Sequence, residues 1–296
     1  MTEDVSQRFV NFDQWSTQDA IEAMYEGQLL AIAAIKTAVS DIAVAAEGAA
    51  ERLSEKGRLV YVGAGTSGRI AVQDGAELGP TFGWPQERMV FCLAGGMEAL
   101  TISAEGAEDD FDDGIKQIRE AKVGKNDVVF GVAASGKTPF TLGALKEANA
   151  LGAMTIGITN NPHTPILEEA DYAILAETGS ELIAGSTRMK AGTSQKAIFN
   201  MLSTAIMTRL GRIYKGFMVD MIVSNKKLEN RAVNMICDIT DCSAEVAGSS
   251  LKTANRHIKT AILITLGENL NSSERILAQA GGNLREALVI MKSIND

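Results

Sequence analysis

The chain has 296 residues, with 28 lysines and arginines against 37 aspartates and glutamates, which gives a formal net charge of −9. This acidic balance disfavours general binding to nucleic acid or to an anionic membrane. Two histidines cannot build a histidine-rich metal centre, and three cysteines without CxxC spacing argue against a disulfide scaffold and indicate a reducing compartment. The first residues do not form a secretory signal, and no apolar run approaches the ~18 residues of a membrane-spanning helix, so we expect a cytoplasmic protein without membrane contact.

Helical and strand patterns follow one another along the first two thirds of the chain. Residues 16–56 are expected to be helical, because Ser16 and Asp19 resemble a capping box and an alanine-rich sequence with helical spacing follows. Five short apolar runs then alternate with helical patterns, as in parallel strands buried between helical layers. The strands are expected at 59–62, 89–93, 128–132, 154–158 and 172–175, with helices at 70–78, 111–121 and 140–151. The pattern predicts an α/β fold with a doubly wound, five-stranded parallel sheet.

The strand patterns stop after residue 192. A long helix is expected at 194–210, and several shorter helical patterns follow between residues 224 and 296. We interpret the chain as an N-terminal helical segment (1–56), a ligand-binding α/β domain (57–220) and a small C-terminal helical subdomain (221–296).

The loop after the first strand carries the sequence GAGTSGR at 63–69, which satisfies the GxGxxG pattern of dinucleotide sites. Such a site also needs an acid at the end of the second strand, and that strand ends in Leu93-Ala94-Gly95-Gly96. The missing acid disfavours a nicotinamide cofactor. A tight turn would explain the glycines, but it would not explain the neighbouring hydroxyl groups.

The same arrangement occurs again after the third strand, where residues 131–138 repeat the glycine, serine and cation spacing with a shift of 68 residues. A third hydroxyl-rich stretch, 186–194, follows the fifth strand. Each stretch places hydroxyl groups, backbone N–H groups and a cation at a helix start, which suits a phosphate monoester. For any single loop, N-capping by serine or threonine is the competing explanation. Together they predict a phosphosugar or similar anion site, with binding residues Gly65, Thr66, Ser67, Ser135, Gly136, Thr138, Ser186, Thr187 and Lys190.

These motifs carry a resemblance to a known family. GAGTSGR at 63–69, AASGKTP at 133–139 and SELIAGSTRMKAGTSQK at 180–196 resemble the sugar isomerase (SIS) domain and, more narrowly, the N-acetylmuramic acid 6-phosphate etherases. The similarity continues through EGAED at 105–109 and covers nearly the whole chain, including Thr2-Glu3. It implies a homodimer with sites at the subunit interface, and the helices at 17–56 and 194–210 are the expected contacts.

The resemblance implies a reaction that needs neither a metal nor a redox cofactor: removal of D-lactate from C3 of a phosphorylated amino sugar. It implies that Glu77 donates a proton to the leaving lactate and that Glu108 is the second catalytic carboxylate and the C2 base, although the two roles could be exchanged. Because Glu108 stands among several other acids, a solvated acidic helix start is the competing explanation. Glu181 occupies the place where sugar isomerases of this superfamily carry a catalytic glutamate, and it is a weaker site candidate.

The sequence departs from the etherase pattern after the first loop. DGAELGP at 74–80 stands where DASECPP is usual, and a methionine is inserted before Glu98, which leaves the exact sugar phosphate open. Three functions remain compatible with the residues. They are an etherase acting in cell-wall amino sugar recycling, a sugar-phosphate isomerase with Glu181 as base, and a non-catalytic sugar-phosphate sensor, like the glucokinase regulatory protein, that binds another protein.

Overall fold

The computed structural model describes residues 1–54, 56–102 and 104–295 and separates into two compact units. The first unit comprises residues 1–76 and 87–206 and contains the sheet, while the second comprises 77–86 and 207–296 and is helical. These bounds differ from the predicted boundaries at 56/57 and 220/221. The N-terminal helical segment is not a separate domain, because residues 34–53 pack on the sheet.

The N-terminal helices are α1 (Thr17–Ala33), the short 3-10 helix η3 (Ala34–Ala38) and α2 (Val39–Leu53). The Ser16 hydroxyl accepts the Asp19 N–H at 3.1 Å, which is the cap that the sequence predicts. Helix α2 lies against β3, β4 and β5 and buries its alanine-rich face. The continuous helical segment Thr17–Leu53 is apolar and long enough to cross a membrane by composition alone, contrary to the sequence expectation, and 33% of its most apolar window is buried inside the protein. Core helices of water-soluble proteins pass the same test.

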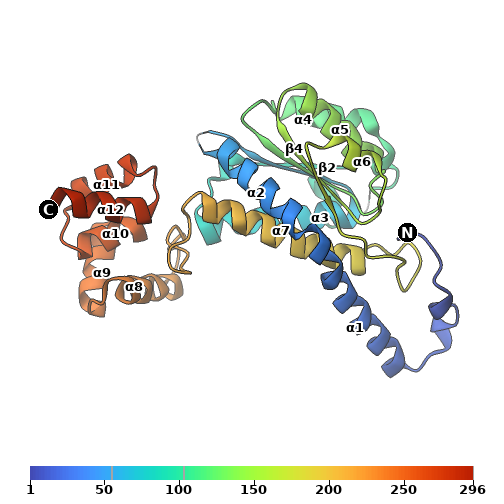
Figure 1. Cartoon of the computed structure of the whole chain (residues 1–296), viewed down its shortest axis with the longest axis horizontal. Coiled ribbons are helices and arrows are strands. Elements are labelled where there is room, and N and C mark those ends of the chain that lie inside the picture. Colours follow the sequence, from blue (N-terminus) through green and yellow to red (C-terminus); the bar gives the residue numbers. More distant parts are fainter. Residues whose placement is uncertain (55, 103, 296) are drawn as a thin grey trace. The chain divides into compact units, whose positions relative to one another are not determined.

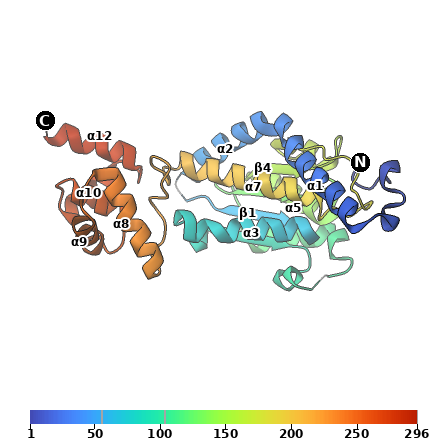
Figure 2. The ribbon, with the colours of Figure 1, turned by 90° about the horizontal axis from the view of Figure 1, so that it is seen from below.

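Five parallel strands form one sheet in the order β2-β1-β3-β4-β5, which confirms the predicted fold class. The strands are β1 (Leu59–Gly63), β2 (Met89–Leu93), β3 (Val128–Val132), β4 (Met154–Thr159) and β5 (Tyr172–Leu175). The helices that connect or follow them are α3 (Gly65–Phe82), α4 (Phe111–Glu120), α5 (Pro139–Ala150), α6 (Pro165–Glu169) and α7 (Lys190–Arg209). Helices α4, α5 and α6 cover one face of the sheet, and α2, α3 and α7 cover the other (Figures 1 and 2).

Alternate residues of each strand enter different cores, because successive side chains in a strand point to opposite faces. On one face, Val60 and Val129 pack in a cluster with Phe140 and other side chains of α4 and α5. On the other face, Tyr61, Phe130 and Phe199 form an aromatic cluster with ring centroids 5.0 to 6.0 Å apart. The sheet is therefore buried on both sides, and its free surface is at the strand ends.

Two helices begin earlier than the sequence pattern indicates. Helix α3 begins at Gly65 rather than 70, and α7 begins at Lys190 rather than 194. In α3, the Gly68 N–H donates to the Ala64 carbonyl and closes the first turn. Hydroxyl residues that we expected in loops therefore lie in the first turns of these helices, where backbone N–H groups are exposed.

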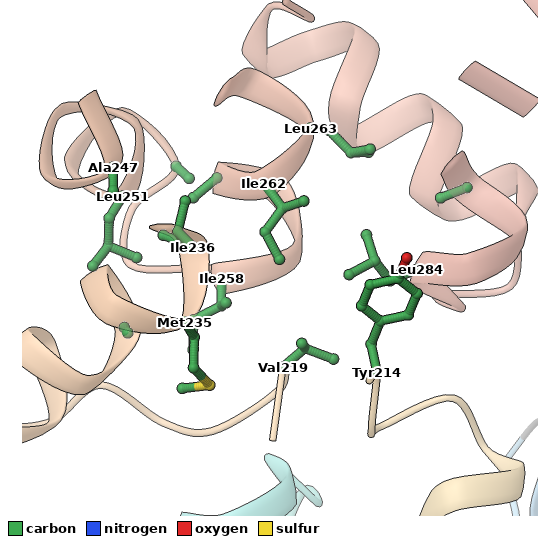
Figure 3. Close-up of a cluster of buried hydrophobic side chains, with 14 of the residues drawn as sticks. Tyr214, Val219, Met235, Ile236, Ala247, Leu251, Ile258, Ile262, Leu263 and Leu284 are labelled. Carbon is green, nitrogen blue, oxygen red and sulfur yellow. The ribbon is translucent and has the colours of Figure 1, made fainter. Parts of the chain in front are cut away.

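The second unit contains α8 (Lys226–Thr240), α9 (Ala244–Thr253), α10 (Ile258–Thr265), α11 (Leu270–Gln279) and α12 (Leu284–Asn295). Asn225, Ser243 and Asn269 accept N–H groups at the starts of α8, α9 and α11. Side chains from these helices meet Tyr214 and Val219 in one apolar cluster (Figure 3). Residues 77–86 belong to this unit, since Arg212 donates to the carbonyls of Phe82 and Gly83 at 3.0 Å.

Candidate functional site

A cavity of about 420 Å³ lies where β1 and β3 end side by side. The sheet has the strand order 2-1-3-4-5. In sheets of this kind the ligand site is typically at the carboxyl ends of the two strands whose connections diverge to opposite faces, which here are β1 and β3. The cavity is lined by residues 64–67 after β1, residues 133–135 and 137–139 after β3, Glu108 and Asp109, and Glu3, Gly185 and Thr187.

The first loop brings a helix N-terminus to the cavity. Gly65 has a φ of +51°, which favours glycine, and it begins α3 directly after the strand. A Cβ on Gly68 would stand 2.8 Å from the Gly63 carbonyl oxygen, so these two glycines permit close packing of strand and helix. The Ser67 side chain lines the cavity and has no hydrogen-bond partner in the described part of the chain. The first-turn N–H groups and the hydroxyl are therefore available to an anion.

The second loop presents Ser135 and Thr138. The Ser135 Oγ accepts the Lys137 N–H at 3.2 Å and lies 3.4 Å from the Thr138 Oγ1. Thr138 precedes α5 but makes no side-chain cap bond, so capping does not explain its hydroxyl. Gly136 does not line the cavity. It has a φ of +67°, and a Cβ there would stand 2.3 Å from the Thr164 Oγ1, which makes it a requirement of the turn.

The third stretch is only partly at the cavity. Thr187 lines it, whereas Ser186, Lys190 and Glu181 do not. Glu181 is fully buried, and its two carboxylate oxygens accept the N–H groups of Lys190 and Ala191 at 3.0 and 2.9 Å. Burial lowers the pKa of Lys190, although Glu181 opposes this shift, and its Nζ donates to the Thr178 carbonyl. Glu181 therefore caps α7.

The acidic stretch after β2 divides into two parts. Asp110 accepts the Asp113 N–H at 2.8 Å and caps α4, so the structural explanation holds for this acid. Glu108 and Asp109 lie one turn earlier in the 3-10 helix η6 (Ala107–Asp109), and both line the cavity. Glu108 is exposed and has no cap contact, so its carboxylate is free to meet a ligand.

Glu77 lies outside the cavity lining. It is exposed on α3, twelve residues beyond Gly65, which corresponds to about 18 Å at 1.5 Å per residue. The structure thus brings together seven of the predicted residues and leaves five elsewhere. At the cavity are Gly65, Thr66, Ser67, Glu108, Ser135, Thr138 and Thr187, while Glu77, Gly136, Glu181, Ser186 and Lys190 are not among its lining residues. The catalytic and binding roles of all twelve stay predictions.

Four polar or glycine positions of the lining were not among the predicted site residues: Glu3, Asp109, Lys137 and Gly185. Of these, Lys137 had a sequence signal within a loop motif, as the cation of the second loop. With Glu108 these four positions bring three carboxylates and one lysine to the cavity, so the charged side chains do not favour an anion by themselves. An anion must be held by the hydroxyl and N–H groups of the two loops. Within the described ranges, no cluster of three or more His, Cys, Asp or Glu side chains could hold a metal ion.

Comparison with known proteins decides the family. The chain is similar to the glucokinase regulatory protein N-terminal SIS domain over residues 41–149 and to the SIS domain over residues 109–205. It is 42% identical over 288 residues to an N-acetylmuramic acid 6-phosphate etherase of Deinococcus radiodurans, covering 97% of this chain and 94% of that protein. The chain belongs to the N-acetylmuramic acid 6-phosphate etherase family.

Further relatives agree with the family and with the fold. An N-acetylmuramic acid 6-phosphate etherase of Symbiobacterium thermophilum is 44% identical over 266 residues, covering 90% of this chain and 88% of that protein. Among solved structures, a phosphoheptose isomerase from Francisella tularensis has a TM-score of 0.52 at 21% identity and covers 66% of this chain and 100% of that chain, which supports the α/β fold alone. The etherase family is the one that the loop motifs predict.

Proposed function

We propose that this chain is a carbon–oxygen lyase that cleaves the D-lactyl ether of N-acetylmuramic acid 6-phosphate and releases N-acetylglucosamine 6-phosphate and D-lactate. The observation that carries the proposal is family membership over nearly the full length, together with a cavity lined by hydroxyl-bearing helix starts and Glu108. Opening of the sugar to its aldehyde acidifies the C2 proton. A base removes this proton, lactate leaves from C3 with a proton from an acid, and water then adds to the C2–C3 double bond.

The phosphate is proposed to bind at the starts of α3 and α5. There Ser67, Ser135 and Thr138 offer hydroxyl groups, and α3 offers the N–H groups of its first turn. Neutral donors and two helix dipoles attract a phosphate dianion without a matching set of cations. The sugar then extends toward Glu108, which is proposed to remove the C2 proton.

Glu77 is proposed to act as the acid from a second copy of the chain. A glutamate side chain cannot span the ~18 Å that separate it along α3 from the Gly65 end of the same helix. A homodimer in which the Glu77 of one copy faces the cavity of the other would complete the acid–base pair. We propose such a dimer because Glu77 is exposed and lies outside its own cavity.

Helix α1 supports the proposed dimer. Ile21, Tyr25, Leu29 and Ile32 are each more than half exposed, and their spacing of four, four and three residues places them on one helix face. Such an apolar stripe is typical of a protein interface. We propose that a second copy covers it, in a cytoplasmic enzyme that consumes a cell-wall amino sugar phosphate.

Release of D-lactate from N-acetylmuramic acid 6-phosphate tests the activity. We expect stoichiometric D-lactate from the wild-type protein and a loss of at least ~10²-fold in kcat for Glu108→Gln, the usual effect of losing a general base. Glu105→Gln is the matched control, because Glu105 lies in the same acidic stretch but does not line the cavity. Folded wild-type protein that binds the sugar phosphate without releasing lactate would refute the proposal and favour a sensor.

Solvent deuterium distinguishes the proposed route from other eliminations. In D₂O the product should carry deuterium at C2, because the C2 proton is exchanged through the enolate. Retention of the original C2 hydrogen would exclude this route. Conversion of an aldose phosphate to a ketose phosphate without lactate release would instead identify an isomerase. The structure does not favour Glu181 as the base of such an isomerase, because both of its carboxylate oxygens accept N–H groups at the start of α7.

A further inference from the structure

Hydrogen bonds join the N-terminal residue Thr2 to the loops that follow β4 and β5, beside the cavity. Thr2 is fully buried, and its N–H donates to the Asn161 Oδ1 at 3.0 Å while the Asn161 Nδ2 donates to the Thr2 Oγ1 at 2.9 Å. The same Nδ2 donates to the Ala134 carbonyl at 3.0 Å, and the Gly185 N–H donates to the Thr2 carbonyl at 3.2 Å. Asn161 follows β4, so one amide joins the chain start to the second loop of the cavity.

These hydrogen bonds of Thr2, which we call the Thr2 anchor, determine the position of the Glu3 side chain. Glu3 lines the cavity, and its carboxylate lies over Gly185, where a Cβ would stand 2.6 Å from the Glu3 Oε2. Gly185 has a φ of +73°, so the position favours glycine for its backbone as well as for the space that it leaves. No hydrogen bond or ion pair of the described residues holds the Glu3 carboxylate, which therefore keeps its acceptor capacity.

A carboxylate in this cavity cannot accept hydrogen bonds from a phosphate dianion and would repel it. The groups of a sugar phosphate that a carboxylate can bind are its hydroxyl donors. We infer that Glu3 is a specificity-determining residue, whose carboxylate binds sugar hydroxyl groups while the loops at the starts of α3 and α5 hold the phosphate. This inference rests on the proposed phosphosugar site but not on the lyase chemistry.

Calorimetric titration separates the two ends of the ligand, with N-acetylglucosamine 6-phosphate and inorganic phosphate as probes. For Glu3→Gln we expect the affinity for the sugar phosphate to fall about ten- to a hundredfold, as for loss of a hydrogen bond to a charged group. The affinity for inorganic phosphate should stay constant or rise, because a nearby negative charge is removed. Asp4→Asn is the matched control, since the neighbouring acid does not line the cavity and should change neither affinity.

A second variant tests the Thr2 anchor. Asn161→Ala removes both side-chain bonds from Asn161 to Thr2 and leaves, among the described residues, only the Gly185 N–H on the Thr2 carbonyl. It should therefore reproduce the loss of sugar phosphate affinity in part, by loosening the segment that carries Glu3. In turnover of N-acetylmuramic acid 6-phosphate, Glu3→Gln should raise KM and leave kcat within about threefold, the pattern of an interaction that is equal in ground and transition states.

Three results would overturn the inference. They are unchanged sugar phosphate affinity in Glu3→Gln, an equal loss of affinity for inorganic phosphate, and wild-type protein that binds the sugar phosphate no better than phosphate. Failure of the lyase proposal would give a result distinct from these three. The wild-type protein would then bind the sugar phosphate and release no D-lactate, while the Glu3→Gln effect on binding would persist.

Discussion

Glu181 allows a sharp test of structure against fold analogy, because the resemblance to sugar isomerases implies a catalytic glutamate there, whereas the structure shows a helix cap. Both carboxylate oxygens accept backbone N–H groups at the start of α7, from Lys190 at 3.0 Å and Ala191 at 2.9 Å. Glu181→Gln keeps one oxygen and replaces the other by an NH₂ group. One buried N–H then loses its acceptor and faces another donor.

The magnitude follows from these two contacts. Leaving a buried donor unsatisfied costs about 1–3 kcal/mol. Removing the negative charge from the positive end of α7 costs up to about 1 kcal/mol more. We therefore expect Glu181→Gln to lower the free energy of unfolding of the sheet unit by about 1–4 kcal/mol, whereas the exposed Glu177→Gln control should change it by less than ~0.5 kcal/mol.

The assay combines stability with turnover. Urea unfolding followed by circular dichroism reports on the whole chain, and hydrogen exchange of the β1 and β3 amides reports on the sheet unit. At a temperature where the variant is folded, D-lactate release should fall by less than the ~10²-fold that loss of a catalytic base produces. A variant as stable as the wild type that has lost catalysis would refute the capping argument and make Glu181 a catalytic residue.

Three further perturbations test the loops, the core and the interface. Gly136→Ala should lower Tm more than Gly179→Ala, because both positions have positive φ (+67° and +65°) but only the Cβ at Gly136 would meet Thr164, at 2.3 Å; equal shifts would contradict this. Burial raises the pKa of Asp74, so the folded state binds its proton more tightly and stability falls as pH rises from about 4 through the raised pKa. Asp74→Asn should gain stability relative to wild type over that range in urea titrations, and parallel pH curves would refute the assignment. Tyr25→Asp should convert the proposed dimer to monomers in analytical ultracentrifugation, and an unchanged mass would exclude the α1 stripe as its interface.

The amino-acid pattern alone predicts the fold class and the positions of the loops that line the cavity. Each strand is a short run of apolar residues buried on both faces, so its pattern is local and readable, and all five strands were predicted within one residue at each end. The loop motifs also depend on neighbours in sequence, because a glycine turn and a helix start need only about six residues. Family membership follows from the same motifs.

Which polar groups meet at the cavity depends on contacts between segments that are far apart in the sequence. Glu3 reaches it because Thr2 bonds to Asn161, a partner 159 residues away that no spacing rule relates to it. Glu181 does not line the cavity, because its carboxylate accepts two backbone N–H groups and caps α7. Glu77 is not among the cavity-lining residues, because twelve residues of α3 separate it from Gly65 and a helix rises about 1.5 Å per residue. Sequence patterns report local backbone geometry. A site, in contrast, is formed by side chains from distant segments, so the packing of the whole unit determines which residues belong to it.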